Sequence, residues 1–446
     1  MQTIIKVSRF ALSFLAALPF CFSAAAQAPS TEPIISTPSI LSASRQGQSD
    51  FLSSQLTLER VIDRFLQRNL SVEAARHRVD VSRAEQIAAR IRPNPGLTVA
   101  AENLKVSGNS PFSVPFNRLY EVSTTYSQTF ELGGKRRLRR EVADLAVSVA
   151  EAELADVLRQ RLFAVKRAYY EAVLTRYALF NAIENRAGFD ELIKFNRVRF
   201  EEGAIAEGEL LKVKLERVKF DTAFAQADLA QRQALIRLLE LLGEQDFSRA
   251  EAVAGELSFE PIAVDLPALK KTALQNRPDV KAAELKTKLS ERRTTLERAR
   301  NSIDLTPFVG VKRVGVDNTV LFGVTIPLRV NDRNQAGIAR ALAEEKVAQS
   351  ELALVRNRAL ADVESAYRAY ETSRDQVGAF QRELLQQADE SYSITLAAYQ
   401  EGATELLPLL EAQRTRAEIR QQYYRTLFDY QTSILLLEQA TGSEVK

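Results

Sequence analysis

The chain has 446 residues, a formal net charge of +3 and a mean hydropathy of −0.18. This charge is too small for a nucleic-acid footprint, so no nucleic-acid partner is expected. The only cysteine and methionine are Cys21 and Met1. This composition excludes a disulfide framework and a thiolate metal site from the rest of the chain.

Residues 1–26 have the features of an export signal. Lys6 and Arg9 form a basic start, residues 10–22 are an apolar stretch too short to span a bilayer, and Ala26 ends a run of small residues. We expect cleavage after Ala26. Beyond it, no segment has the roughly 18 continuous apolar residues of a transmembrane helix. An exported chain of this kind is periplasmic, secreted or in the outer membrane.

Two further features concern the N-terminal region. Cys21 raises the alternative of a lipid anchor, but Phe20 is bulky where a lipoprotein signal has a small residue. Residues 27–55 are rich in Ser, Pro, Thr and Gln and lack periodicity. They are expected to form a disordered lead-in.

The rest of the chain reads as an internal duplication, with repeats at 56–250 and 251–446. A shift of 208 residues aligns Val72 with Val280, Ala75 with Ala283 and Arg92 with Arg300. A shift of 199 aligns Gly203 with Gly402, Leu211 with Leu410, Arg217 with Arg416, Leu238 with Leu437 and Gly243 with Gly442. Each repeat is expected to contain two helices, two strands and two long helices.

The first two helices begin after Thr57 and end at about Arg92, because Pro93 and Pro95 cannot continue a helix. The apolar period then changes from 3.6 to 2, which indicates strands at 97–106, 120–130 and 305–313 and around 320–326. The side chains predicted to face lipid are Tyr120, Val122, Tyr126, Phe130, Val320, Phe322, Val324 and Ile326. Strands of about ten residues suit a tilted transmembrane β-strand. Two surface hairpins on a helical protein are the alternative.

The long helices carry apolar residues at alternating spacings of four and three. Residues 136–202 contain no Pro and only one Gly, which predicts a helix of roughly 100 Å. The seams are Leu154, Leu158, Leu162, Val165, Tyr169 and Ala172, then Leu211, Leu215, Val218, Thr222, Ala225 and Leu229, and in the second repeat Tyr423, Leu427, Tyr430, Ile434 and Leu437. This spacing is typical of antiparallel coiled coils, and it disfavours a compact enzyme.

Four strands cannot close a barrel, and open strand edges are not tolerated in lipid. Three copies would supply twelve strands, and cyclic symmetry would close the sheet without an edge. The same symmetry would place the long helices side by side as a tube. The predicted fold is therefore mainly α with a small β part, in which a helical periplasmic tube carries a 12-stranded trimeric barrel.

With this duplicated order of helices and strands, the sequence resembles a known family, the TolC-like outer membrane factors. The strings closest to its heavy-metal (cobalt-zinc-cadmium) branch are Arg92-Pro93-Asn94-Pro95 with Glu102-Asn103, Phe130-Glu131-Leu132-Gly133-Gly134-Lys135-Arg136, and Phe200 and Tyr399, each three residues before a glycine. The resemblance covers about 56–443. It implies an outer-membrane channel and passive exit duct in a tripartite, RND-type efflux system, with an inner-membrane pump and a periplasmic membrane-fusion adaptor as partners.

The resemblance also implies candidate functional residues and a substrate. The adaptor-docking tips would be Gly203, Ala204, Gly402, Ala403 and Thr404. Asp389 and Glu390 precede the second tip and are candidates for an acidic pore constriction, against the alternative of an exposed surface pair. Heavy-metal cations are the expected cargo. A duct for organic compounds is the alternative, and a soluble periplasmic coiled-coil adaptor is the alternative of another class, which would need no lipid-facing strands.

Other motifs do not indicate catalysis. Gly133-Gly134-Lys135 lacks the first Gly and the final Ser or Thr of a phosphate loop. His77 is the only histidine, and no oriented partner for it is evident. Arg136, Arg137, Arg139 and Arg140 form either a solvated face or a contact with anionic headgroups. We therefore expect no enzyme activity, no catalytic residue, no cofactor and no metal site.

Overall fold

The computed structural model describes residues 56–103, 121–248 and 252–445, all within one compact unit that spans 54–446. The expected signal peptide, Cys21, the lead-in 27–55 and Tyr120 lie outside the described residues. Among these residues, none of the helices combines the length and apolar composition required to cross a membrane.

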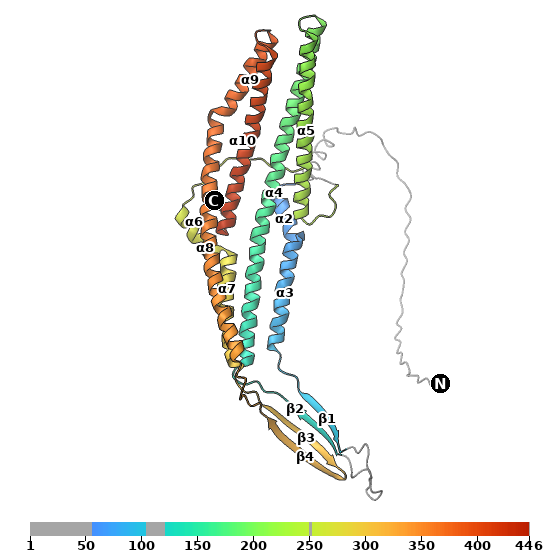
Figure 1. Ribbon diagram of the computed structural model, residues 1–446, viewed down its shortest axis with the longest axis vertical. Coiled ribbons are helices and arrows are strands. Elements are labelled where there is room, and N and C mark those ends of the chain that lie inside the picture. Colours follow the sequence, from blue (N-terminus) through green and yellow to red (C-terminus); the bar gives the residue numbers. More distant parts are fainter. Residues whose placement is uncertain (1–55, 104–120, 249–251, 446) are drawn as a thin grey trace, which may run out of the picture. The chain divides into compact units, whose positions relative to one another are not determined.

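The same order of elements occurs twice (Figure 1). The first set comprises α2 (Leu58–Arg68), α3 (Leu70–Arg90), β1 (Gly96–Glu102), β2 (Glu121–Ser127), α4 (Lys135–Glu201) and α5 (Glu207–Leu241). The second set comprises α6 (Leu266–Asn276), α7 (Pro278–Ala299), β3 (Thr306–Val314), β4 (Asp317–Thr325), α8 (Gln335–Ala379), the π-helical segment η2 (Phe380–Leu384), α9 (Leu385–Gln400) and α10 (Leu406–Thr441).

Local chemistry sets the helix boundaries. The side chain of Thr57 accepts a hydrogen bond from the backbone N–H of Arg60, and that of Asn69 accepts from Ser71 and Val72, which caps α2 and α3. Pro278 occupies the first turn of α7, where its missing N–H costs nothing.

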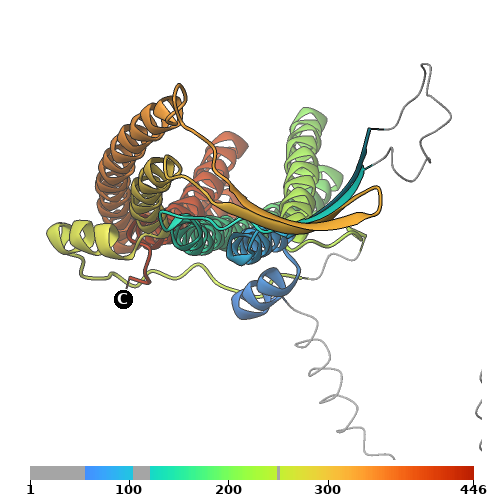
Figure 2. The same cartoon turned by 90° about the horizontal axis from the view of Figure 1, so that it is seen from below.

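The four strands form one antiparallel sheet in the order β1-β2-β3-β4. Figure 2 shows the four strands from below, as one curved layer. β3 and β4 have nine residues, close to the expected length of about ten, whereas β1 and β2 have seven. Phe130 lies beyond β2, where it forms an isolated bridge with Leu305, and Ile326 follows the last residue of β4.

The helices form two antiparallel hairpins, α4 with α5 and α8–α9 with α10, joined through contacts between α4 and α10 (Figure 1). Two of the predicted seams pack inside this arrangement, because Val165, Tyr169, Leu427 and Tyr430 belong to the main hydrophobic core. The first repeat keeps one continuous helix of 67 residues, α4. The second repeat is interrupted by η2, which the sequence pattern did not predict.

Candidate functional site

One face of the sheet is apolar and exposed. Paired residues of an antiparallel sheet lie on the same face, so the register Leu97–Tyr126–Val309–Phe322 places all four side chains together. Phe322 is 83% exposed and Leu97 is 70% exposed. The same face also carries Val99, Ala101, Val122, Thr124, Val311, Val320 and Val324, with the polar residues Arg313 and Asn318 in its last row, beside the β3–β4 turn. A patch this large on a soluble surface would be unusual, because exposed apolar area of this kind marks an interface or a lipid contact.

The opposite face of the sheet is more polar, although it also carries Phe308, Val314 and Leu321. Lys312 forms ion pairs with Glu121 and with Glu102, and Glu121 also accepts a hydrogen bond from Asn103. Ser123 and Thr125 alternate with the apolar residues of β2 and therefore belong to this face. The sheet thus separates an apolar side from a charged, hydrogen-bonding side, which is the alternation of a membrane strand that borders water.

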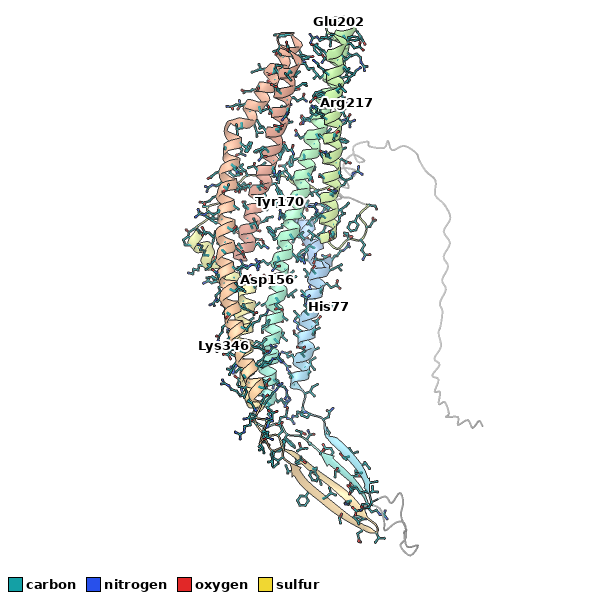
Figure 3. All side chains as sticks on the ribbon, viewed as in Figure 1. His77, Asp156, Tyr170, Glu202, Arg217 and Lys346 are labelled. Carbon is teal, nitrogen blue, oxygen red and sulfur yellow. The ribbon has the colours of Figure 1, made fainter. Side chains whose placement is uncertain are left out.

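Glycines end the long helices at both hairpin turns. Gly203 has φ 76° and Gly402 has φ 77°, a left-handed conformation that favours glycine. The N–H of Ala204 donates to the carbonyl of Arg199, as the N–H of Ala403 does to that of Ala398. These bonds form the same helix-terminating motif in both repeats. Figure 3 labels Glu202, which lies at the first turn.

Ala204 and Ala403 are exposed at these turns, whereas Thr404 is half-buried. A Cβ added at Gly203 or at Gly402 would meet open space. The two turns therefore offer small, accessible side chains next to backbone that another molecule can approach closely.

The two carboxylates at the predicted constriction are not equivalent. Asp389 accepts hydrogen bonds from Arg416 and Arg420 of α10. Burial alone would raise the pKa of Asp389, but these two guanidinium groups outweigh it and hold the pKa below its ordinary value. Glu390 is exposed and accepts a hydrogen bond from the neutral side chain of Gln386. Glu390 therefore presents the less compensated negative charge.

One predicted seam faces outward. Leu211, Leu215, Val218 and Leu229 of α5 are each more than half exposed, and among the described elements α5 contacts mainly α4. A heptad-spaced apolar stripe with no partner helix among the described residues is suited to pairing with another helix. The sequence spacing identified the stripe, but it did not reveal that the stripe lies on an outer edge.

A charged cluster at the N-terminal end of α7 was not predicted from the sequence. Arg277 is almost fully buried; it donates two hydrogen bonds to Asp279, one to Asp362 of α8 and one to the carbonyl of Ala440. Arg159 of α4 pairs with Asp156, which Figure 3 labels, and donates to the carbonyl of Gln439. The arginines thus bind the last carbonyls of α10, where helix ends carry negative partial charge.

The remaining candidates have structural surroundings. Lys135, the last residue of the apparent phosphate loop, is buried, and its Nζ donates to Asp304 and to the carbonyl of Ser302. His77 is exposed on α3, 3.8 Å from Glu73 and 3.6 Å from Asp80 (Figure 3). Across the described ranges, His, Cys, Asp and Glu form no group of three that could hold a metal ion.

Comparison with known proteins agrees with this geometry. The family model described as outer membrane efflux protein matches residues 61–244 and 269–443. The cobalt-zinc-cadmium resistance protein CzcC of Cupriavidus metallidurans is 26% identical, over 83% of this chain and 86% of its own length. The nickel-cobalt-cadmium resistance protein NccC of Alcaligenes xylosoxydans xylosoxydans is 30% identical, over 67% of this chain and 66% of its own length. The crystal structure of the Campylobacter jejuni CmeC outer membrane channel superposes with a TM-score of 0.74 at 18% identity, over 86% of this chain and 85% of that one.

Proposed function

The chain belongs to the outer membrane efflux protein family, and from this premise we propose that it is a passive exit duct for heavy-metal cations in a tripartite, RND-type efflux system. Membership places the protein in the outer membrane, with a large periplasmic part, among channels rather than enzymes. The repeats proposed at 56–250 and 251–446 would each supply one strand pair and one helical hairpin.

The exposed apolar face of the sheet carries the proposal. Its side chains, among them Leu97 on β1 and Phe322 on β4, would contact lipid. The opposite face, with Lys312 and Glu121, would border the aqueous pore. Val122, Tyr126, Val320 and Val324 would belong to the lipid-facing set. Phe130 and Ile326, just outside the strands, would lie at its margin, and Tyr120 stays a prediction.

A homotrimer would satisfy the edges that one chain leaves open. Within the described residues, β1 pairs only with β2, and β4 only with β3. Pairing of β4 with β1 of the next copy, repeated three times, would close twelve strands. The exposed stripe of α5 would then pack on a helix of the neighbouring copy. Cross-linking in native membranes should give a trimer, and a monomer as the sole species would contradict this assembly.

Heavy-metal cations are proposed as cargo because relatives over most of the chain are cobalt-zinc-cadmium and nickel-cobalt-cadmium resistance proteins. A duct would not need to bind soft metals through ligands, and the pump would select them. Asp389 and Glu390, in three copies, would place negative charge near the closing end of the tube. Glu390 would contribute most, because two arginines already compensate Asp389.

The hairpin turns are proposed as the docking surface for a periplasmic membrane-fusion adaptor. Gly203, Ala204, Gly402 and Ala403 are exposed at the end of each hairpin, and Thr404 is half-buried beside them. These turns lie at the opposite end of the long helices from the sheet (Figure 1). An adaptor bound there would connect the duct to an inner-membrane pump without contacting the membrane-facing strands.

The cargo is tested by deleting the gene and measuring growth with cobalt, zinc, cadmium and a panel of organic toxicants. The proposal expects increased sensitivity to the metals, restored by the wild-type chain but not by an assembly-deficient variant. Unchanged metal tolerance together with increased sensitivity to organic compounds would instead support a duct for organic cargo.

A further inference from the structure

Positive charge gathers where the sheet meets the helices. The connections 90–95, 128–140, 298–305 and 326–335 contain eleven basic and three acidic residues, although the whole chain has a net charge of only +3. The basic residues are Arg90, Arg92, Lys135, Arg136, Arg137, Arg139, Arg140, Arg298, Arg300, Arg329 and Arg333. All four connections join a strand to a helix, so they lie at the same level of the fold (Figure 1).

The less exposed members of this group have structural partners. Lys135 pairs with Asp304, and Arg139 donates from its two terminal guanidinium nitrogens, Nη1 and Nη2, to Glu131. These contacts hold the start of α4 against the segment that precedes β3. They use two of the three acidic residues in the four connections, so little negative charge remains for the outer arginines.

Four of the outer members are exposed, and the fifth, Arg329, is half-buried. Arg92, Arg140, Arg298 and Arg333 are exposed, and none forms an ion pair with another described residue. The Nε atom of Arg329 is buried and has no hydrogen-bond partner in the described part. We name Arg92, Arg140, Arg298, Arg329 and Arg333 the arginine belt. Guanidinium groups bind phosphate through paired N–H donors, which a lysine cannot do.

Apolar side chains in the same connections point to lipid rather than to a soluble anion. Leu328 is 79% exposed and Val330 is 70% exposed, on either side of Arg329. Ile91 beside Arg92 and Leu132 near the start of α4 are exposed as well. These residues continue the apolar exposure of the sheet beyond the strand ends. Exposed aliphatic groups interleaved with arginine are typical of a bilayer boundary, where acyl chains meet phosphates.

We propose that the arginine belt binds the phosphate groups of anionic phospholipids, in the leaflet nearest the helices. The proposal rests on the proposed membrane function, since it assumes that the apolar face of the sheet lies in the bilayer. It adds a headgroup preference that an apolar face alone does not provide. Binding there would fix how deep the sheet lies in the membrane.

The test compares two triple variants of the full chain. The belt variant carries Arg92→Gln, Arg140→Gln and Arg333→Gln, from three different connections. The control carries Arg161→Gln, Arg358→Gln and Arg425→Gln, which are exposed arginines on helices far from the sheet. Each protein is reconstituted in an equal mixture of phosphatidylcholine and phosphatidylglycerol and extracted gently, and the lipids that remain bound are counted by native mass spectrometry.

The wild type and the control should retain phosphatidylglycerol in preference to phosphatidylcholine. In the belt variant, the ratio of retained phosphatidylglycerol to phosphatidylcholine should be about tenfold lower. High salt should weaken the preference in the wild type. Equal retention of both lipids by the wild type, or equal loss in both variants, would overturn the belt. Full displacement of phosphatidylglycerol by inorganic phosphate would show that the belt binds a soluble anion rather than a lipid headgroup.

Assembly into pure phosphatidylcholine separates the two proposals. A wild-type protein that inserts there but shows no headgroup preference would refute the belt and leave the membrane function intact. A protein that inserts into no bilayer would refute the membrane function and the belt together.

Discussion

The Nε of Arg416 on α10 donates a 2.6 Å hydrogen bond to Oδ1 of Asp389 on α9. The Nε of Arg217, labelled in Figure 3, donates a bond of the same length to Oδ1 of Asp190. Both members of the first pair lie 199 residues after those of the second. Each helical hairpin is therefore fastened by the same ion pair, about ten residues from its turn. In both carboxyl groups the pKa is lowered by these arginines.

Breaking the Asp389–Arg416 pair should loosen the second hairpin locally. Because Asp389 is partly exposed, water and salt screen the pair, and we expect a coupling of about 0.5–1 kcal/mol. A double-mutant cycle of Asp389→Asn and Arg416→Gln, read by hydrogen exchange of the α9 amides, measures it. Arg414→Gln, which breaks an exposed pair on α10 alone, is the control. Additive single effects would show that the pair does not fasten the hairpin.

A second contact joins the two hairpins to each other. The hydroxyl of Tyr399 on α9 donates to the side-chain oxygen of Asn196 on α4, and Asn196 is fully buried. Tyr399→Phe leaves that oxygen without its donor, which should cost about 1–3 kcal/mol. Hydrogen exchange of amides at both helix ends gives the measurement. Tyr392→Phe, whose hydroxyl forms no hydrogen bond with a described residue, should change little, and equal effects would contradict this assignment.

The sheet register predicts a difference between its two faces. Phe322→Arg would place a charge on the apolar face, at a cost of about 2–4 kcal/mol if that face meets the bilayer core. Thr319→Arg places the same charge on the polar face of the same strand. We expect the first variant to reduce the amount of assembled protein in outer-membrane fractions and the second to be tolerated. Similar amounts of both would show that the apolar face does not contact lipid.

The sequence predicted the elements that depend on periodicity and missed those that depend on distant contacts. The spacing of Val165 and Tyr169 predicted a buried helix face, and Gly203 and Gly402 predicted turns with positive φ, because these signals are local. Some strand ends were overestimated, since alternation continues to Phe130, whereas β2 ends at Ser127 and only an isolated bridge joins Phe130 to Leu305.

The cluster around Arg277 shows why other features could not be predicted. Its partners Asp362 and Ala440 lie 85 and 163 residues away, and nothing in the local sequence connects them. The environment of Asp389 depends in the same way on α10. The family resemblance located Asp389 near the second turn, but only the fold shows that arginines compensate its charge.

The Arg277–Asp279 contact predicts a pH dependence of stability. Burial alone would raise the pKa of Asp279, but hydrogen bonds and charge from Arg277 lower it below 3.8. A lowered folded-state pKa stabilises the fold above pH 3.8, and this contribution is lost as pH falls through the lower folded value. Asp279→Asn should cost about 2 kcal/mol near neutral pH. The difference from the wild type should vanish in strong acid, as followed by urea unfolding at several pH values.

The control for this experiment is Glu291→Gln, an exposed side chain on the same helix with no ion pair among the described residues. It should give no pH-dependent difference in the free energy of unfolding. An Asp279→Asn effect that is the same at every pH would mean that packing, rather than the carboxylate charge, supports this corner of the fold.

The hairpin turns provide the last prediction. Ala204 and Ala403 are exposed where the chain reverses, and their small size allows another backbone to approach closely. Glutamate at both positions adds bulk and a charge that docking would have to desolvate. Ala204→Glu with Ala403→Glu should therefore leave the trimer and its membrane insertion intact but abolish efflux-dependent resistance. Cross-linking to the adaptor and growth under metal stress are the two measurements.

A matched variant separates docking from a general effect of added charge. Ala84→Glu with Ala343→Glu adds the same two charges at exposed helix positions remote from the turns, and should keep both cross-linking and resistance. The turns also end the helices, so circular dichroism must show unchanged helix content in both variants. If the turn variant still cross-links to its adaptor and still confers resistance, the adaptor binds elsewhere, because no close contact at Ala204 and Ala403 would tolerate both changes.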